Sequence, residues 1–193
     1  VDELIYQDVV ASLYLRNSLS EIIEQTEKKI FIPLTVAGGI RSIEDIRSIL
    51  RAGADKVAIN TAAIENPELL YEAAKIFGSQ CIVCSIEAYR KDDGRYEVWV
   101  DYGREPSGVD AVEWAKRAED LGAGEILLTS INNDGMGHGF YIELLNKIST
   151  IVSIPVIACG GAGNKNDFVK AVKEGKADAV AAASIFHYYY AMP

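Results

Sequence analysis

The sequence predicts an α/β fold, a (β/α)8 TIM barrel, from three observations. Short apolar runs alternate with amphipathic segments along the chain, which is typical of consecutive βα units. The stretch IPVIACGGAG at 154–163 repeats in shape as IPLTVAGGI at 32–40. Gly160 follows Gly38, and Pro155 follows Pro33, by the same interval of 122 residues. A fixed interval indicates a duplicated architecture, and two-fold duplication of βα units favours the barrel.

Each expected strand is a short apolar run that ends at a glycine, a polar residue or a capping residue. The expected strands cover 4–10, 33–36, 56–60, 80–87, 125–130, 155–159 and 179–183. Between them, amphipathic segments with capping residues predict helices at 20–29, 42–53, 67–77, 110–121, 142–151 and 167–174. The turn signal at 91–94 before the alternating residues 96–102 predicts a hairpin inserted after the fourth strand.

The duplication also indicates what this chain does not contain. A counterpart of Glu87 would fall upstream of residue 1, and complete barrels typically take about 250 residues. We therefore expect 1–193 to be a single barrel domain that is incomplete at both ends. The first strand would be absent, and the last helix would only begin after Ser184. An open sheet edge favours association, and we expect the truncated chain to be inactive on its own.

Composition restricts the class of protein. Of the 193 residues, 49% are hydrophobic, which suits a domain with a substantial core. No apolar run reaches the roughly 18 residues that a membrane span requires, and the net charge of −9 argues against a nucleic-acid partner. The three cysteines are an odd number, so reduced thiols and a cytoplasmic location are expected. Two of them, Cys81 and Cys84, lie in one apolar run that favours core packing over a redox or zinc motif.

Phosphate cradles are predicted where strands end in glycines and hydroxyl residues. Glycine lets backbone N–H groups approach an anion because no Cβ intervenes. One candidate cradle combines Gly160 and Gly161 with Ser184, and the other combines Gly38 and its neighbour with Thr61. A plain strand-to-helix turn is the alternative for either. Two cradles on one scaffold indicate a ligand with a phosphate at each end.

Catalytic side chains are expected at the carboxyl ends of barrel strands. Glu87 ends the strand at 80–87 and, in a partly dry site, would have a raised pKa and work as a general acid or base. The alternative is a rim carboxylate paired with Arg90. Asp134, next to Gly135, would hold a polar ligand or only shape its loop.

Charged residues also mark the opposite, amino-terminal ends of the strands. Glu3, Lys56 and Glu125 occupy these positions, and Glu125 follows Glu3 by the repeat interval of 122. Structural salt bridges are one interpretation. The other is a ring of alternating charge that gates the bottom of the barrel.

These segments resemble the cyclase subunit of imidazole glycerol phosphate synthase, a family of histidine biosynthesis. The resemblance is carried by DELIYQD at 2–8, GADKVAINTA at 53–62, FGSQ at 77–80, GAGEILLTS at 122–130, GGAG at 160–163 and AASIFH at 182–187. It implies a (β/α)8 barrel without a cofactor or a metal, which receives ammonia from a glutaminase partner at its bottom. Ammonia would join phosphoribulosyl formimino-aminoimidazole carboxamide ribonucleotide, giving imidazole glycerol phosphate and aminoimidazole carboxamide ribonucleotide.

The resemblance also assigns roles to residues of this chain. One phosphate of the substrate would be bound by Gly39, Asn60 and Thr61, and the other by Gly135, Gly161 and Ser184. Asp134 would contact the substrate, Glu87 would be catalytic, and Asp55 would lie at the glutaminase interface. Glu3, Lys56 and Glu125 match three of the four gate residues of the family.

Departures from the family pattern leave two further functions open. The family has Asp where this chain has Glu87, and an Asp-x-Asp-Gly loop where this chain has Asn132 and Asn133 before Asp134. The catalytic Asp of the first strand would lie outside this chain. One alternative function is a paralogue that supplies ammonia for the amidation of surface-polysaccharide sugars. The other is a non-catalytic phosphate-binding scaffold or ammonia conduit.

Overall fold

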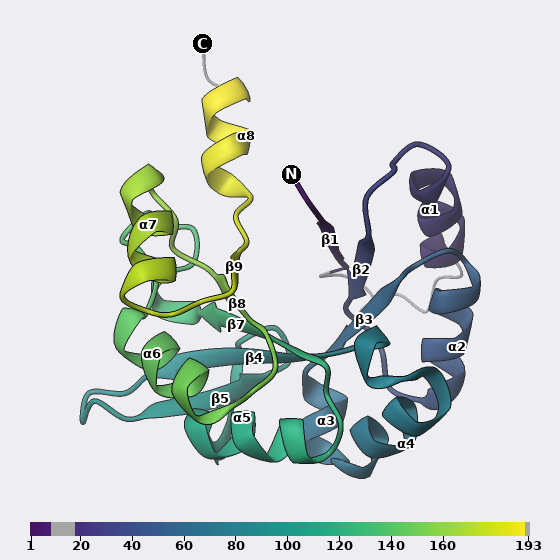
Figure 1. Cartoon of the computed structure of the whole chain (residues 1–193), viewed down its shortest axis with the longest axis horizontal. Coiled ribbons are helices and arrows are strands. Elements are labelled where there is room, and N and C mark those ends of the chain that lie inside the picture. Colours follow the sequence, from purple (N-terminus) through teal and green to yellow (C-terminus); the bar gives the residue numbers. More distant parts are fainter. Residues whose placement is uncertain (9–17, 192–193) are drawn as a thin grey trace. The chain divides into compact units, whose positions relative to one another are not determined.

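The computed structural model describes residues 1–8 and 18–191. The chain forms two compact units. Unit 1 is Val1–Cys84 together with Leu121–Gly124, and unit 2 is Ser85–Asp120 together with Glu125–Pro193. Strands alternate with helices along most of the sequence, except that β4, β5 and β6 follow one another directly (Figure 1).

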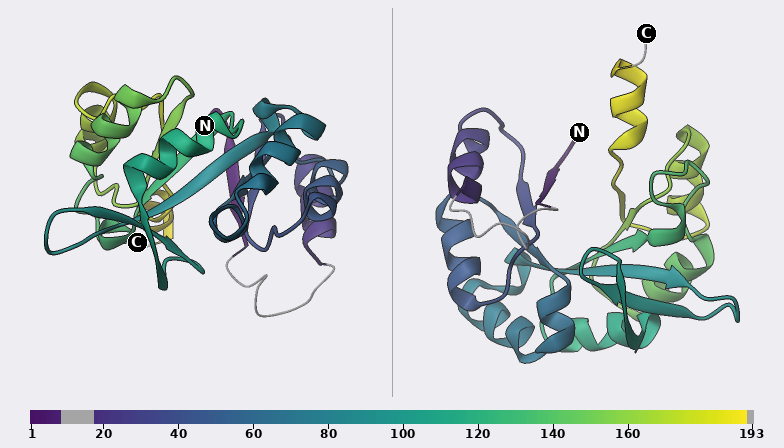
Figure 2. Two further views of the ribbon diagram at one scale, coloured as in Figure 1. Left: turned by 90° about the horizontal axis from the view of Figure 1, so that it is seen from below. Right: turned by 180° about the vertical axis from the view of Figure 1, so that it is seen from behind.

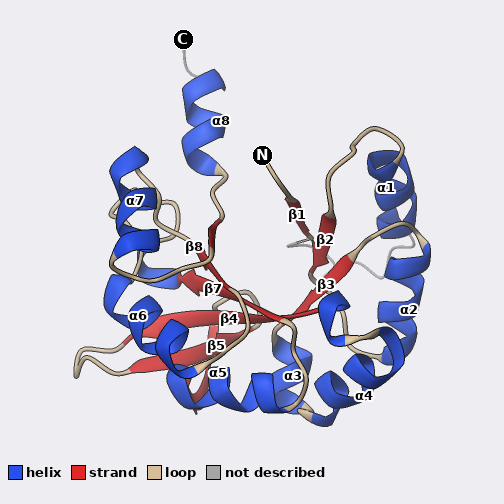
Figure 3. Cartoon of the chain, viewed as in Figure 1, coloured by secondary structure: helices blue, strands red, loops and turns tan. Residues whose placement is uncertain are grey.

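Unit 1 is built on parallel strands. These are β1 (Leu4–Gln7), β2 (Leu34–Ala37), β3 (Lys56–Ile59) and the first residues of β4 (Ile82–Arg90). Neighbouring strands pair in parallel, with Leu4 opposite Leu34 and Val57 opposite Ile82. The helices of unit 1 are α1 (Ser18–Glu27), α2 (Ile43–Arg51), α3 (Thr61–Glu65), α4 (Glu68–Phe77) and the 3₁₀ turn η1 (Ser79–Cys81). In Figure 3, α1, α2 and α4 lie on the same side of these strands.

Helix α2 shows how the sequence sets its own boundaries. The Ser42 hydroxyl accepts a hydrogen bond from the Asp45 amide and caps the helix. The Asp45 carboxylate accepts from the Arg41 amide rather than from the Ser42 amide, so only half of a capping box forms. Ile46 and Ile49 point into the core, as their spacing predicts.

Unit 2 combines an antiparallel hairpin with a second set of parallel strands. The remainder of β4 pairs with β5 (Tyr96–Val100), which pairs with β6 (Glu105–Asp110). The parallel strands are β7 (Glu125–Ser130), β8 (Val156–Cys159) and β9 (Ala179–Val180). The helices are α5 (Ala111–Asp120), α6 (Ile142–Ile151), α7 (Lys165–Lys173), α8 (Ser184–Ala191) and the 3₁₀ turn η2 (Ile131–Asn133). Figure 2 shows the tip of the β4–β5 hairpin projecting past the helices of its unit.

The predicted βα architecture is confirmed. The seven predicted strands all occur and pair in parallel, and the hairpin forms at the predicted turn. Strand β6 and helix α3 were not predicted, because their sequences carry neither alternation nor a full helical repeat. Cys81 lies in η1 and not in the strand, whereas Cys84 is buried in β4. Residues 9 and 10 of the first predicted strand lie outside the described residues.

The core of each unit is aliphatic. The largest fully buried side chains of unit 1 are Ile23, Leu34, Ile46, Ile59, Leu70 and Ile82, and those of unit 2 are Ile86, Ile126, Leu128, Leu144, Leu145 and Ile148. Burial of such side chains is worth about 1.5–3 kcal/mol each. Most residues of these strands are buried because helices or other strands cover them, as expected for parallel sheets.

The internal duplication is visible in matched hydrogen bonds within the two units. Asp55 accepts from the Leu34 amide at 2.8 Å and donates its own amide to the Leu34 carbonyl at 2.9 Å. Asp178 makes the same pair of contacts with Val156, at 2.9 Å each. Each carboxylate therefore ties the start of one strand to the first residue of the preceding strand. The interval between equivalent residues grows from 122 to 123 near Lys176, a residue with φ of 58°, which is the site of the inserted residue.

We predict that the two carboxylates contribute equally to stability. Asp55→Ala and Asp178→Ala each remove the acceptor of a backbone amide, so each should lower the free energy of unfolding by about 1 kcal/mol. Urea unfolding monitored by circular dichroism measures this change. Asp92→Ala, at an exposed position of the hairpin turn, is the control and should stay within about 0.5 kcal/mol. A clearly unequal cost at the two positions would contradict their structural equivalence.

Candidate functional site

The most unusual side chain in the described residues is Glu87. It lies on β4, directly opposite Trp99 of β5. Only 8% of Glu87 is exposed, and its Oε2 atom is buried without a hydrogen-bond partner in the described structure. A buried carboxyl group with an unsatisfied oxygen is costly, so its presence points to function.

The surroundings of Glu87 disfavour its ionised form. Burial is the largest cause, and together with the charges of Asp134 and Asp101 it raises the pKa of Glu87 to about 7. A hydrogen bond from the Gly103 backbone works in the opposite direction. At neutral pH the protonated and ionised forms are therefore both populated, which suits a general acid or base. The alternative pairing with Arg90 does not occur, because the Arg90 guanidinium lies over the Tyr96 ring, 6.0 Å from its centroid.

Two residues near Glu87 were missed by sequence reasoning. Asp101 lies in the turn between β5 and β6, and Cys159 ends β8. Burial raises the pKa of the Cys159 thiol, to which the charges of Asp134 and Glu87 add. The sequence signal for Asp101 was available in the Asp-Tyr-Gly turn, but the third hairpin strand that positions it was not predicted.

The loop at 132–139 packs against the glycine turn that follows β8. Asn133 donates through Nδ2 to the Gly139 carbonyl, and the Gly139 amide donates to the Gly161 carbonyl, both at 2.7 Å. Gly161 has φ of 109°, and a Cβ there would lie 2.2 Å from the Gly139 oxygen. Glycine is therefore required at 161 for the close approach of two backbones. Asp134 and Gly135 are exposed on this loop.

The second cradle is partly occupied by the protein itself. The Asp167 carboxylate accepts from the amides of Gly163 and Asn164, at 2.9 and 3.0 Å. An anion would therefore approach the turn at Gly161 rather than at Gly163. Ser184 begins α8, and the first turn of a helix offers amides without helical acceptors.

The first cradle has the same construction in unit 1. Gly38 and Gly39 follow β2 with φ of 100° and 71°, and a Cβ on Gly38 would overlap the Asp8 carbonyl at 2.1 Å. Asn60 caps α3, and the Thr61 hydroxyl donates to Asn60 Oδ1 at 3.1 Å. In this unit, the carboxyl ends of β1 and β2 lie against each other at Asp8 and Gly38, and Asn60 and Thr61 follow the end of β3.

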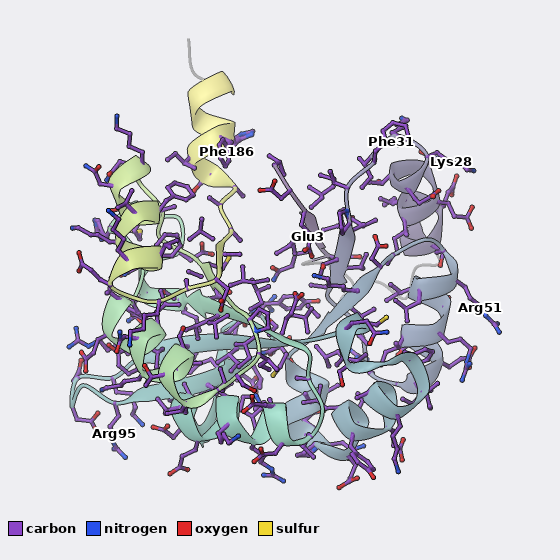
Figure 4. All side chains as sticks on the ribbon, viewed as in Figure 1. Glu3, Lys28, Phe31, Arg51, Arg95 and Phe186 are labelled. Atoms are coloured by element: carbon purple, nitrogen blue, oxygen red, sulfur yellow. The ribbon has the colours of Figure 1, made fainter. Side chains whose placement is uncertain are left out.

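At the amino-terminal ends of the strands of unit 1, two of the three predicted gate residues form an ion pair. Lys56 Nζ lies 2.9 Å from Glu3 Oε2, and the Thr35 hydroxyl donates to the other oxygen of Glu3. Both charged side chains are mostly shielded from solvent, with 17% and 26% exposed. Figure 4 shows Glu3, which directly precedes β1. Glu125 belongs to unit 2, where its Oε2 atom is buried.

The segment before β2 carries an unpacked aromatic side chain. Phe31 is 100% exposed and lies close to Lys28 beyond the end of α1 (Figure 4). It precedes the first residue of β2 by three positions. Phe31 therefore lies at the amino-terminal ends of the strands, where Glu3 and Lys56 also lie. Sequence reasoning missed it, although a Phe between lysines and a Pro is an available signal.

The part of the chain that is described also bears on metal binding and on membrane insertion. That part contains no group of three or more His, Cys, Asp or Glu side chains arranged to hold a metal ion. None of its helices combines the length and the apolar character needed to cross a membrane.

Three features define an enzyme of the (β/α)-barrel class: parallel strands separated by helices, glycine turns at the carboxyl ends of strands, and a buried carboxyl group. Comparison with known proteins narrows this class. The family described as "Histidine biosynthesis protein" matches residues 1–191. A relative from Alkaliphilus metalliredigens, imidazole glycerol phosphate synthase subunit HisF, is 51% identical over 187 residues, covering 97% of this chain and 74% of that protein. A Legionella pneumophila protein of the same name is 59% identical over 167 residues, covering 86% of this chain and 79% of that protein.

The chain therefore belongs to the histidine biosynthesis family and, within it, to the HisF subunits of imidazole glycerol phosphate synthase. The resemblance carried by the sequence motifs is confirmed.

We predict a pH-dependent stability that depends on Glu87. Its pKa is about 7 in the folded protein and near the ordinary 4.5 when unfolded, so the unfolded state loses the proton first as the pH rises. The free energy of unfolding should therefore decrease between pH 4.5 and 7, by up to about 3 kcal/mol in total. Glu87→Gln should remove this decrease, and denaturation at a series of pH values measures it.

Glu72→Gln, an exposed position of α4, is the matched control and should retain the full decrease. If Glu87→Gln and the unmodified protein respond identically to pH, the carboxyl group is not held neutral by the fold.

Proposed function

We propose that this chain acts as the cyclase subunit of imidazole glycerol phosphate synthase in histidine biosynthesis, with Glu87 as its general acid or base. The observation that carries the proposal is a buried carboxyl group of near-neutral pKa in a chain of the HisF family. In its protonated form Glu87 donates a proton to the reacting ribonucleotide, and in its ionised form it accepts one. The resemblance assigns ammonia and phosphoribulosyl formimino-aminoimidazole carboxamide ribonucleotide as the substrates.

The two glycine turns are proposed to bind the two phosphates of that substrate. One phosphate would contact Gly39, Asn60 and Thr61 in unit 1. The other would contact Gly135, Gly161 and Ser184 in unit 2, and Asp134 would contact the substrate. Positive φ values at Gly39, Gly135 and Gly161 support this assignment, because these backbones adopt conformations that leave N–H groups accessible to an anion.

Ammonia is proposed to come from a glutaminase subunit that binds at the amino-terminal ends of the strands. The ion pair of Glu3 with Lys56, held by Thr35, would form part of the gate together with Glu125. This ion pair is mostly shielded from solvent, which supports a role in closing the path of ammonia. Asp55 would contact the glutaminase through the carboxylate oxygen that does not bind the Leu34 amide.

The decisive experiment measures ammonia-dependent formation of imidazole glycerol phosphate by the full-length protein. Glu87→Gln keeps the size of the side chain and removes its acid, so kcat should fall by about 10²- to 10⁴-fold. Glu72→Gln serves as the control again and should retain full turnover. Rapid quench and chromatographic detection of both products measure the rate.

The cyclase reaction and the role of Glu87 are rejected by different results. Absence of turnover by the unmodified full-length protein would exclude the reaction itself. Turnover that survives Glu87→Gln would remove the role of this carboxyl group. Function that survives Glu87→Ala but not Lys56→Ala would favour the non-catalytic scaffold or ammonia conduit.

A second candidate function is the supply of ammonia for the amidation of surface-polysaccharide sugars. It is favoured by two differences from the family. Glu87 stands where the family has the shorter Asp, and the uncharged Asn132 stands where the family has a charged Asp. Asn132 accepts a hydrogen bond from the Arg90 amide at 2.9 Å, so its side chain serves the hairpin rather than a ligand. Genes for polysaccharide enzymes beside this one, in place of histidine enzymes, would favour this candidate.

We predict that Phe31 anchors the glutaminase partner. A fully exposed Phe gains about 1.5–3 kcal/mol when it is buried, and aromatic side chains are enriched in the centres of interfaces. Phe31→Ser should therefore weaken binding of the glutaminase by about tenfold or more, as measured by calorimetry.

Phe186→Ser is the matched control, because Phe186 is also exposed, at 51%, but lies at the start of α8 (Figure 4). It should leave binding unchanged. Equal affinity of the Phe31→Ser and unmodified proteins would place the partner elsewhere.

A further inference from the structure

The β4–β5 hairpin carries two aromatic side chains on the same face as Glu87. Glu87 lies directly opposite Trp99 in the antiparallel ladder, and Tyr89 follows Glu87 by two positions on β4. Opposite residues of an antiparallel pair, and residues two apart on one strand, share a face of the sheet. The rings of Tyr89 and Trp99 stack, with 4.5 Å between their centroids and 28° between their planes. A stacked aromatic pair therefore stands beside the buried acid.

The two faces of this hairpin differ in burial. Ala88, Val98 and Tyr96 belong to the opposite face, and at most 5% of each residue is exposed. Tyr89 and Trp99 are only partly buried. The core of unit 2 therefore packs against the first of these faces and leaves part of the aromatic pair in contact with solvent.

The charged residue at the far end of the aromatic face is engaged within the hairpin. Glu97 lies opposite Tyr89, and its carboxylate is 3.0 Å from Lys91 Nζ. The same carboxylate accepts a hydrogen bond from the Gly108 amide at 2.7 Å. The surface between Glu97 and Glu87 thus consists of the two aromatic rings.

Glu87 adds a hydrogen-bonding atom to this surface. Its Oε2 atom is buried without a partner in the described structure, and only 8% of the residue is exposed. The β5–β6 turn closes one side of the carboxyl group, since a Cβ on Gly103 would lie 3.6 Å from Oε2. Buried polar atoms are normally paired, so this atom points to a ligand that supplies its partner. A planar ring with N–H groups fits, because it stacks on an aromatic face and forms hydrogen bonds at its edge.

We propose that Trp99, held by Tyr89, binds a planar nitrogen heterocycle of the substrate by stacking and places the edge of that ring against Glu87. Trp99 touches the ligand, whereas Tyr89 is a positioning residue that acts through Trp99. The identity of the ring as an aminoimidazole carboxamide rests on the proposed cyclase function. The stacking of a planar ring does not.

The test compares the binding of two ligands to the full-length protein by calorimetry. Aminoimidazole carboxamide ribonucleotide carries the ring, and ribose 5-phosphate is the same sugar phosphate without it. Trp99→Leu keeps an apolar side chain and removes the flat ring. Stacking of a base on an aromatic side chain corresponds to roughly 5- to 150-fold in affinity, so Kd for the ribonucleotide should rise by about tenfold or more. Kd for ribose 5-phosphate should stay unchanged.

Two further variants complete the series. Trp99→Phe keeps an aromatic ring and should retain most of the affinity for the ribonucleotide. Tyr71→Leu is the matched control, because Tyr71 is an aromatic residue of α4 in unit 1 that is 42% exposed. It should bind both ligands as the unmodified protein does.

Fluorescence reports the contact directly. The chain has two tryptophans, and Trp114 is only 2% exposed. The ribonucleotide should change the emission of the unmodified protein by stacking on Trp99, and ribose 5-phosphate should not. The change should persist in Tyr71→Leu and disappear in Trp99→Phe, where Trp114 is the remaining indole.

The outcomes separate the role of Trp99 from the cyclase function. An unchanged Kd for the ribonucleotide in Trp99→Leu, an equal loss of affinity for both ligands, or an emission change that survives in Trp99→Phe would overturn this role even if the protein turns over. An unmodified protein that binds the ribonucleotide no better than ribose 5-phosphate would overturn it as well. Selective loss of the ribonucleotide in a protein without cyclase turnover would support Trp99 and reject the cyclase.

Discussion

The structure depends on pairs of backbone contacts that fix where parallel strands start. In unit 1, Asp55 binds both backbone groups of Leu34, and in unit 2, Asp178 does the same for Val156. A parallel strand that slipped by one residue would turn its buried face outward. Because the starts of the strands are fixed, their carboxyl ends are fixed too, and the glycine turns follow at set positions.

Among these strands, β4 carries a buried carboxyl group, that of Glu87, which lowers the stability of the folded protein. Glu87 is surrounded by β4, the β5–β6 turn and the loop after β7, and its acidic neighbours make ionisation more difficult still. A neutral Gln of the same size would avoid this cost, so packing alone does not account for the acid. Retaining a group at such a cost is what general acid–base chemistry requires, because a catalytic pKa is most effective near the working pH.

Much of this architecture could be predicted from local sequence. The runs ending at Gly38 and Gly160 identified the strands, and their common interval identified the duplication. The environment of Glu87 could not be predicted in the same way, because it depends on Asp101, which reaches the site only through a hairpin strand without alternation. Phe31 was missed for another reason, since exposure is a property of the folded surface and leaves no periodic signal.

The two departures of the sequence from its family are physically related. Asn132 accepts the Arg90 amide as an aspartate would, but adds no charge to a loop that already contributes Asp134. Glu in place of Asp carries the carboxyl group one methylene further from β4, toward the Asp101 turn. Both departures therefore lie beside the same buried acid: one leaves the loop after β7 without a further charge, and the other moves the carboxyl group toward the β5–β6 turn.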